Sequence, residues 1–488
     1  MIIELSSSRD HLSWIVCLFL LTSCAVGPNY TRPRAALPTT YSSTSKTVST
    51  QTTGGQSQRF VANKAIPQQW WKLFHSKPLN DLVRASLQHN PSVGVAQAAL
   101  HGALENVYAQ QGAFYPNVGL NFTPLKQETA KLLTSVLASN QYNYSLYTGQ
   151  VFVSYTPDVF GGIRRQLESL IAQAQSQRFQ LEATYLTLSS NVVNAAIQEA
   201  AVRAQIQATQ SMIASQRKIV NIARKQLQSG DVSEADTALQ ESALAATESS
   251  LPALEKQLEL QRNLINALIG RFPDDALTPT FTLDSLQLPT DLPISLPSCL
   301  VEQRPDIRAA EEQMHAANAL IGVAVSNRLP NVTIGFTNAG TAATSLSSLF
   351  QPGTLFWSLA GIITQPVFDA GTLVHKQRYA QAMYEQAAAQ YRLTVINAFQ
   401  NVSDTLKSIR LDAIALHVAK KAEQAALKGL NIARQQLASG DASTLLVLSN
   451  EQLYQQARFN LIQAQANRLS DTVALFQALG GGWSTRYP

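Results

Sequence analysis

The chain has 488 residues, of which 45% are hydrophobic and only 14% are charged. This charged fraction is well below the roughly 25% of ordinary soluble domains, and the abundance of apolar residues excludes a disordered chain. The net charge of +5 is small for this length, and no run of five or more lysines and arginines occurs. We therefore expect no nucleic-acid partner.

The N-terminus has the features of an export signal. A polar start precedes an apolar core, 12–21, which is too short for a permanent membrane helix. The core ends in Leu-Thr-Ser-Cys24, which resembles the bacterial lipobox. We predict that residues 1–23 are a lipoprotein signal peptide and that the Cys24 thiol carries diacylglycerol; the alternative is an incidental thiol. Ala25 follows in place of Asp, which in the lipoprotein sorting pattern implies transport to the outer membrane.

The cysteine count agrees with a lipid-modified chain. Cys17 would leave with the signal and Cys24 would be lipidated, so Cys299 would be the remaining free thiol and no intrachain disulfide is expected. Nothing later in the sequence approaches the 18 or more apolar residues of a membrane helix. If the mature chain crosses a membrane, it must do so with strands.

Most of the mature chain is an internal duplication. NIARKQLQSGDVS, starting at Asn221, and NIARQQLASGDAS, starting at Asn431, agree at ten of thirteen positions. Upstream, NPSVGVAQAAL at Asn90 is matched by RPDIRAAEEQM at Arg304. Self-similarity of this kind predicts two copies of one structural unit. We predict a lipid-anchored segment (24–66), a first repeat (67–270), a Pro-rich connector (271–302), a second repeat (303–480) and a C-terminal tail (481–488).

Each repeat is expected to contain the same elements in the same order. A Pro opens a helix of moderate length, and alternating apolar and polar residues then predict two strands. A long helical hairpin completes the repeat. The predicted helices are about 92–114 and 306–327, the strands 117–123, 147–155, 331–337 and 355–364 (within about 116–156 and 330–367), and the hairpins about 162–270 and 371–480.

The long helices should form a coiled coil and end at the duplicated turn. The stretch from Gly162 to about Gln228 has no internal proline or glycine, so a continuous helix would run on the order of 100 Å at 1.5 Å per residue. Within it, apolar residues recur at sevens, which is coiled-coil spacing: Ile206, Ile213, Val220 and Leu227. A glycine suits the left-handed position that ends each helix, and a serine three residues later can cap the next one.

The four strands favour a membrane location. Strands of about ten residues cross an outer membrane when tilted. Four strands cannot close a barrel, and an open edge facing lipid leaves backbone groups unpaired, so several chains would have to combine. The alternative is a small sheet packed on the helices of a soluble protein. The export signal and aromatic residues near strand ends, Phe122, Tyr147, Tyr155 and Trp357, favour the membrane and an obligate oligomer.

Several motifs, in order, carry a family resemblance. They are CAVGPNYTRP at Cys24, WWKLF at Trp70, DVFGGIRR at Asp158, SGDVS at Ser229, RPDIRAAEEQMHAANALIGVA at Arg304, PVFDAG at Pro366 and SGDAS at Ser439. The chain resembles the TolC and OprM-like outer-membrane efflux factors, in particular their lipoprotein (NodT-type) branch. The resemblance implies a mainly α fold with a membrane β-barrel: an internally duplicated helical-hairpin (coiled-coil) tunnel, four strands per chain, and a homotrimer with one twelve-stranded barrel.

The resemblance also implies a function. The chain would be the outer-membrane channel of a tripartite efflux system, lying in outer-membrane lipid with a long periplasmic extension. It would passively export drugs or other toxic small molecules, handed over by an inner-membrane pump of the RND type and a periplasmic adaptor. No catalytic or nucleotide-binding motif occurs, and the histidines are scattered, so we expect no enzyme activity, cofactor or metal. The alternatives are a protein-secretion channel and a lipid-anchored coiled-coil scaffold without a pore.

By this resemblance, the channel gate lies just after the second turn. Leu445 takes the place of the apolar constriction, whereas Leu446 and Ser449 stand where the family usually has acidic residues. A ring of carboxylates would select cations, so their absence argues against assuming cation selectivity. The alternative for the leucines is ordinary coiled-coil core.

The hairpin tips have two further expected roles. Leu437 and Ala442 stand where the family often has an aromatic and a basic residue that lock the closed state. Either a different lock uses Arg224 and Arg434, or closure is mainly apolar through Leu445 and Leu446. The tips should also contact the adaptor. The expected docking residues are Gly230, Asp231, Ser233, Gly440, Asp441 and Ser443.

Overall fold

The computed structural model describes residues 25–33, 57–62, 64, 66–132, 137, 140–273, 279–294 and 297–482. The predicted signal peptide and Cys24 lie outside the described residues. The chain divides into two compact units, each assembled from three stretches of sequence. Unit 1 comprises Met1–Pro33, Leu100–Ser176 and Ala310–Tyr391, and unit 2 comprises Arg34–Ala99, Gln177–Ala309 and Arg392–Pro488.

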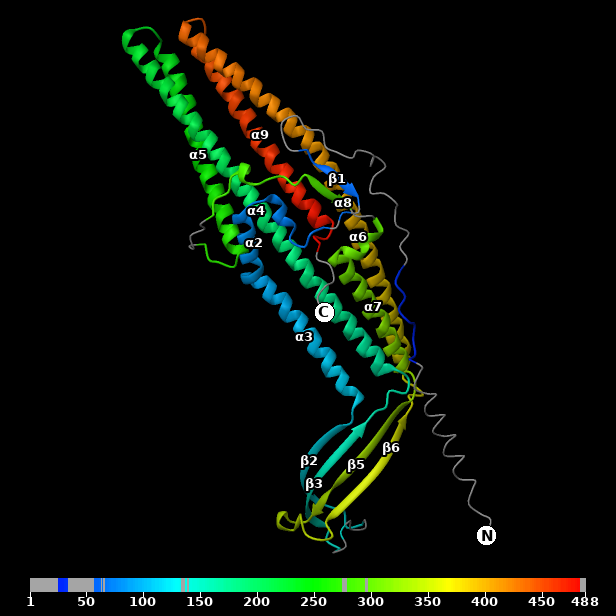
Figure 1. Cartoon of the computed structure of the whole chain (residues 1–488). Coiled ribbons are helices and arrows are strands. Elements are labelled where there is room, and N and C mark those ends of the chain that lie inside the picture. The colour runs from blue at the N-terminus through cyan, green and yellow to red at the C-terminus, as the bar shows by residue number, and fades with distance from the viewer. Residues whose placement is uncertain are drawn as a thin grey trace. The chain divides into compact units, whose positions relative to one another are not determined.

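Unit 1 contains a four-stranded antiparallel sheet in the order β2-β3-β5-β6 (Figure 1). Each repeat contributes one hairpin of neighbouring strands, which confirms the expected four strands per chain. β2 and β5 extend about six residues further than the predicted strands, because their distal halves lack the apolar alternation from which strands are recognised. The strands are β2 (Asn117–Glu128), β3 (Asn143–Tyr155), β5 (Asn331–Ala343) and β6 (Leu355–Thr364), and a short 3-10 helix, η5 (Leu346–Ser348), follows β5.

One face of this sheet is apolar and exposed in the single chain. The register pairs Val118 with Val153 and Leu120 with Val151, so these side chains share one face. Leu120 is 83% exposed. On β6, Trp357 and Ile363 are exposed as well. Among the described residues β2 and β6 each have a ladder on one side only, so the sheet has two open edges.

The helices follow the predicted duplication closely. Each repeat has a medium helix, then a helix of 68 residues and a returning helix of 35 residues. The equal lengths place the two turns at matching positions. In the part of the chain that the structure describes, no helix combines the length and apolarity needed to cross a membrane. The helices are α3 (Pro91–Gln111, continued by η3, Gly112–Phe114), α4 (Gly162–Ser229) and α5 (Glu234–Leu268), and α7 (Pro305–Ser326), α8 (Thr372–Ser439) and α9 (Thr444–Ala478).

Unit 2 contains several elements that the sequence patterns did not predict. Trp70 is fully buried and stacks on Phe476 with ring centroids 5.2 Å apart. Two four-residue strands pair in parallel although one precedes the first repeat and the other lies in the connector. These two strands are too short to give a measurable period, and they lie in the predicted N-terminal segment and in the predicted connector. These elements are β1 (Arg59–Ala62), η2 (Trp70–Phe74), α2 (Lys77–His89), η4 (Leu283–Ser285), β4 (Asp291–Ile294) and α6 (Pro297–Gln303).

Candidate gate at the hairpin tips

Both long hairpins turn with the same backbone geometry. Gly230 and Gly440 have φ of 80° and 83°. In the first tip the N–H of Asp231 donates to the carbonyl of Gln226 at 2.8 Å, and that of Gly230 to Leu227 at 3.1 Å. The second tip repeats both bonds. This is the Schellman arrangement, which satisfies the last helical carbonyls and requires a left-handed residue. Nothing lies within 4 Å of a Cβ placed on either glycine, so both tips present open backbone.

Aspartates and serines complete the two turns. The carboxylates of Asp231 and Asp441 accept a hydrogen bond from the serine hydroxyl two residues earlier, at 2.6 and 2.8 Å. Ser233 caps α5 by accepting from the N–H of Asp236 at 3.1 Å, and it donates to the Asp236 carboxylate at 2.7 Å. Ser443 accepts from the N–H of Leu446 at 3.4 Å. The second cap therefore has an apolar side chain where the first has a carboxylate.

The predicted lock arginines have different surroundings. Arg224 binds Glu241 at 2.7 Å within the first hairpin, and both side chains are exposed. Arg434 binds Glu451 at 2.9 Å within the second, but Glu451 is only 1% exposed. Arg434 also donates to the hydroxyl of Ser215 at 2.6 Å. Since Ser215 belongs to α4, Arg434 connects the second hairpin to the first.

An apolar cluster surrounds this polar contact. Leu430 and Ala433 of α8 and Val447 of α9 are buried together, and Ile219 of α4 packs against them with Leu437 and Tyr454. Three of the four predicted heptad residues of α4, Ile206, Ile213 and Val220, are buried, and the fourth, Leu227, is half-buried. The second hairpin is therefore held against α4 by both apolar packing and the Arg434 bridge.

The predicted gate residues lie just beyond this cluster on α9. Leu445 is 59% exposed and Leu446 is 42% exposed in the single chain, and Ser449 is exposed as well. The next two residues, Val447 and Leu448, are buried. Within one chain, then, the core at this level is formed by Val447 and Leu448, and the predicted gate side chains face outward.

The sequence patterns did not indicate that Glu451 and Ser215 bind Arg434. The structure buries Glu451 against Arg434, so its charge is neutralised at the contact and does not lie in solvent. One signal was available in the sequence. The same arginine-to-glutamate spacing of seventeen residues occurs in both hairpins, at Arg224 and Glu241 and again at Arg434 and Glu451. The contact with Ser215 had no such signal, because it depends on how the two hairpins pack.

A groove of about 740 Å³ runs beside the bridge in unit 2. It is lined by residues of α4, α8, α9 and η4, and arginines from three helices border it. The arginines are Arg203, Arg434 and Arg458. Among the described residues, no group of three or more His, Cys, Asp or Glu side chains is placed to hold a metal ion.

A second polar cluster lies further along the second hairpin. Burial, together with a hydrogen bond to Asp471 and its charge, raises the pKa of Asp412 to about 7. Arg468 is buried nearby and donates to the side-chain oxygen of Gln58 at 3.3 Å; burial lowers the pKa of its guanidinium. One Asp412 carboxylate oxygen is buried without a hydrogen-bond partner. Such an oxygen favours the protonated acid, which can donate to Asp471.

Comparison with known proteins assigns the family. A family model described as outer membrane efflux protein matches residues 82–271 and 296–481, which is most of the chain. The chain belongs to the outer membrane efflux protein family. The predicted resemblance, the duplicated helical-hairpin fold and the outer-membrane location are thereby confirmed.

Individual members of the family agree over nearly the whole length. The pyoverdine export outer membrane protein OpmQ of Pseudomonas putida is 26% identical over 89% of this chain and 93% of its own. The probable efflux pump outer membrane protein TtgC of the same species is 27% identical over 98% and 96%. The solved outer-membrane channel OprN is 25% identical, with a TM-score of 0.84 over 94% of this chain and 100% of its own. This outer membrane efflux protein is accordingly an outer-membrane channel component for export.

Proposed function

We propose that three copies of this chain form a channel that passively exports small molecules, such as drugs or other toxic compounds, across the outer membrane. An inner-membrane pump of the RND type and a periplasmic adaptor would hand over these compounds. The relatives support this cargo class, because one is named for pyoverdine export and another for an efflux pump. In this proposal Cys24 carries the lipid anchor.

The sheet of unit 1 is the observation that carries the proposal. Its apolar face is exposed, and its two edge strands have unpaired backbone groups in the single chain. In lipid each unpaired group would cost several kcal/mol. Three copies would pair edge to edge into twelve strands, which removes the edges and directs the apolar face to lipid. A single chain has no comparable arrangement.

The gate would close by combining three sets of tip residues. Leu445 and Leu446 face outward beside Ser449, so three copies would bring apolar side chains together around an axis. Arg434, bound to Glu451 and Ser215, would hold the second hairpin in the closed position against α4. Arg224 is bound within its own hairpin, so we assign the lock to Arg434 alone.

The adaptor would open the channel by binding the tips. Gly230 and Gly440 offer exposed backbone that a partner helix can approach closely. The neighbouring Asp231, Ser233, Asp441 and Ser443 supply polar groups at the same surface. If the adaptor contacts the tips better when the second hairpin has moved away from α4, binding shifts the population toward the open state. The channel needs no chemistry of its own for this step.

The first experiment measures export and assembly together. Cells lacking the gene, complemented with wild type or Cys24→Ser, are tested for accumulation of dyes, antibiotics and aromatic acids. Purified protein is measured for mass in detergent and for conductance in a planar bilayer. We expect accumulation that the wild type reverses, a mass of three chains and step-like conductance. A monomer without conductance would support a scaffold, and export of proteins alone would support a secretion channel.

Leu446→Asp tests the gate in the same apparatus. Three added carboxylates at the constriction should raise selectivity for cations, measured as a shift in reversal potential under a salt gradient. The exposed Gln452→Asp on the same helix serves as a control. An unchanged reversal potential in Leu446→Asp would place the constriction elsewhere.

A further inference from the structure

The residues that follow Cys24 are bound to other residues of unit 1 by a set of specific contacts. We call residues 25–33 the N-terminal strap. It is not part of a helix or strand, so its backbone must find other hydrogen-bond partners. The N–H of Val26 donates to the carbonyl of Phe160 at 3.0 Å. The carbonyl of Pro28 accepts from the Asn318 side chain at 3.0 Å.

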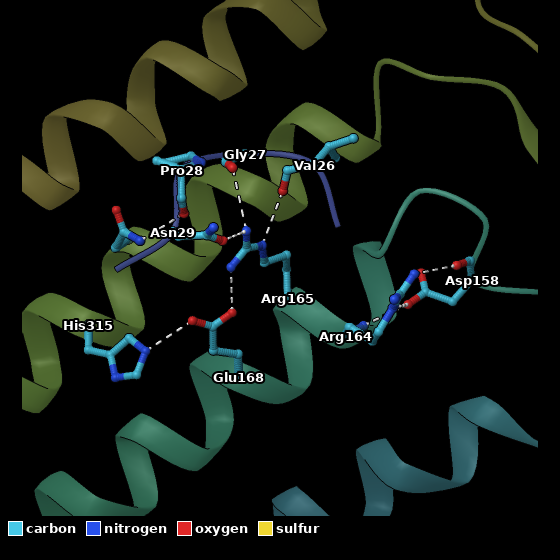
Figure 2. A network of polar contacts seen from close by, with 10 residues as sticks. Val26, Gly27, Pro28, Asn29, Asp158, Arg164, Arg165, Glu168 and His315 are labelled. Atoms are coloured by element: carbon cyan, nitrogen blue, oxygen red, sulfur yellow. Dashed lines mark hydrogen bonds and ion pairs between the residues drawn. The ribbon is translucent and has the colours of Figure 1, made fainter. Parts of the chain in front are cut away.

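Arg165 supplies most of the remaining contacts, as Figure 2 shows. Arg165 is nearly buried, at 4% exposure. It donates to the carbonyls of Val26 at 3.1 Å and Gly27 at 3.4 Å, and to the side-chain oxygen of Asn29 at 2.6 Å. Three positions of the strap, Val26, Gly27 and Asn29, are therefore bound by one side chain of α4. Burying a charge for this purpose is costly unless the charge is paired.

Glu168 pairs with Arg165 and connects it, through His315, to a second part of the strap. Glu168 binds Arg165 at 2.8 Å and His315 of α7 at 3.0 Å (Figure 2). Burial alone would raise the pKa of Glu168, but these hydrogen bonds outweigh it and lower the pKa. The ring of His315 stacks on Tyr30 of the strap at 4.3 Å. A further ion pair, Arg32 with Glu311 at 2.8 Å, holds the end of the strap.

Glycines make room for the strap. Gly27 has φ of +92°, and a Cβ there would lie 2.4 Å from the Cα of Gly322. A Cβ on Gly322 would lie 2.8 Å from the carbonyl oxygen of Val26, and one on Gly161 would lie 2.6 Å from the Cα of Ala25. The backbone of the strap thus lies directly against the start of α4 and against α7, at distances that a larger residue would not allow.

We propose that Arg165 clamps the strap so that the lipid on Cys24 enters the membrane at one fixed place beside the strand sheet. Ala25, one peptide bond from Cys24, lies against Gly161, between the end of β3 and the start of α4. Without the clamp, the eight residues 25–32 would behave as a tether with an end-to-end distance of about 16 Å. The clamp removes this slack, so the anchor and the strands insert as one body. The inference rests on the proposed lipidation and trimer.

Arg164 provides a matched control. It is the adjacent arginine of the same helix, and its guanidinium binds Asp158 at 3.1 Å away from the strap (Figure 2). Arg165→Leu and Arg164→Leu therefore remove the same charge from neighbouring positions, but only the first removes the hydrogen bonds to Val26, Gly27 and Asn29. Should Arg165→Leu fail to fold, Gly27→Val prevents the strap from seating while the helices remain unchanged.

The first readout is hydrogen–deuterium exchange of the purified full-length protein, followed in peptides that cover residues 25–33. We expect exchange there to become about tenfold faster in Arg165→Leu and in Gly27→Val, and to stay at the wild-type rate in Arg164→Leu. Wild-type exchange in Arg165→Leu would overturn the clamp.

The second readout separates anchoring from folding. Arg165→Leu is made in the lipidated chain and in a chain exported by a signal peptide cleaved directly before Ala25, and the cross-linked trimer in outer membranes is quantified. We expect the substitution to lower the lipidated chain to the level of the unlipidated one and to change the unlipidated chain no further. An equal loss in both, or no loss in the lipidated chain, would overturn the proposal.

The wild type itself reports failure of the underlying proposals. Absence of labelled palmitate on the wild-type chain would refute lipidation, and absence of its trimer would refute the assembly. Either result is read without any Arg165 variant, so it is distinguishable from failure of the clamp alone.

Discussion

The two hairpin tips share their turns but differ in what holds them in place. Both end a 68-residue helix with a left-handed glycine and the same pair of backbone bonds. Both contain an arginine and a glutamate seventeen residues apart. In the first hairpin both side chains are exposed. In the second Glu451 is buried, and the half-buried Arg434 also binds Ser215 of α4.

This difference shows how a duplicated unit acquires two roles. A turn depends on local backbone geometry, so duplication reproduces it. The strength of an ion pair depends on burial and on a third partner, which packing supplies to one copy only. In the proposed mechanism the first hairpin serves as a fixed support, and the second is the element whose release would open the gate.

The largest difference between the two hairpins is expected when the arginine of each one is replaced by alanine. Arg434→Ala leaves the carboxylate of Glu451 buried without its cation, which should cost about 2–3 kcal/mol. Arg224→Ala removes an exposed pair and should cost less than about 1 kcal/mol. Thermal unfolding and the open probability in planar bilayers measure both. We expect only Arg434→Ala to lower the melting temperature markedly and to raise the open probability.

Two further variants decide whether the bridge itself is responsible. Glu451→Gln keeps a hydrogen-bonding side chain without a charge to bury, so combining it with Arg434→Ala should recover part of the lost stability. Ser215→Ala should raise the open probability with a smaller loss of stability. Equal effects of Arg224→Ala and Arg434→Ala would contradict the distinction between the hairpins.

The carboxyl pair of the second hairpin should make stability depend on pH. Asp412 has its pKa raised from 3.8 to about 7 in the folded chain. The folded state therefore binds more protons than the unfolded state between these values, and stability should fall as pH rises from about 4 to about 7. Asp412→Asn should remove much of this slope and raise stability at neutral pH.

The first hairpin supplies the control for this prediction. At the positions matching Asp412 and Asp471 it has Val202 and Gln261. Val202→Asn should therefore leave the pH slope unchanged. Melting temperatures measured across this pH range compare the variants, and a slope retained by Asp412→Asn would assign it to other groups.

Substitution of the turn glycines should destabilise both hairpins equally, because the two turns have the same backbone geometry. Alanine at Gly230 or Gly440 must adopt a positive φ, at a cost of about 1–2 kcal/mol. Since a Cβ meets nothing within 4 Å at either position, no steric term distinguishes them. Equal losses of melting temperature are expected. A clearly larger loss at one tip would show that the two turns are not equivalent.

The smallest effects on stability are expected from the helix caps. Ser233→Ala removes a cap that also contacts the Asp236 carboxylate and should cost about 1 kcal/mol, whereas Ser443→Ala removes a longer bond and should cost about 0.5 kcal/mol. Helix content followed by circular dichroism during thermal unfolding compares them. A greater loss for Ser443→Ala would reverse this order.

Local sequence signals were sufficient to predict the strands, the long helices and the turns. The alternating residues after Pro116 and Pro330 predicted strands because side chains alternate across a sheet. The sevenfold spacing of Ile206, Ile213 and Val220 predicted the buried side of α4, and glycine predicted each turn. Duplication doubled the evidence for every one of these elements.

Contacts between distant segments could not be predicted from the sequence, because they depend on how the helices and strands pack. The sequence places Ser215 far from Arg434, Trp70 far from Phe476, and the strap far from Arg165. Packing brings each pair together, and no period or spacing encodes such a contact. For the same reason the two arginines of the tips looked equivalent in the sequence. Burial, which arises only when the hairpins pack, makes Arg434 the bridge and leaves Arg224 at the surface.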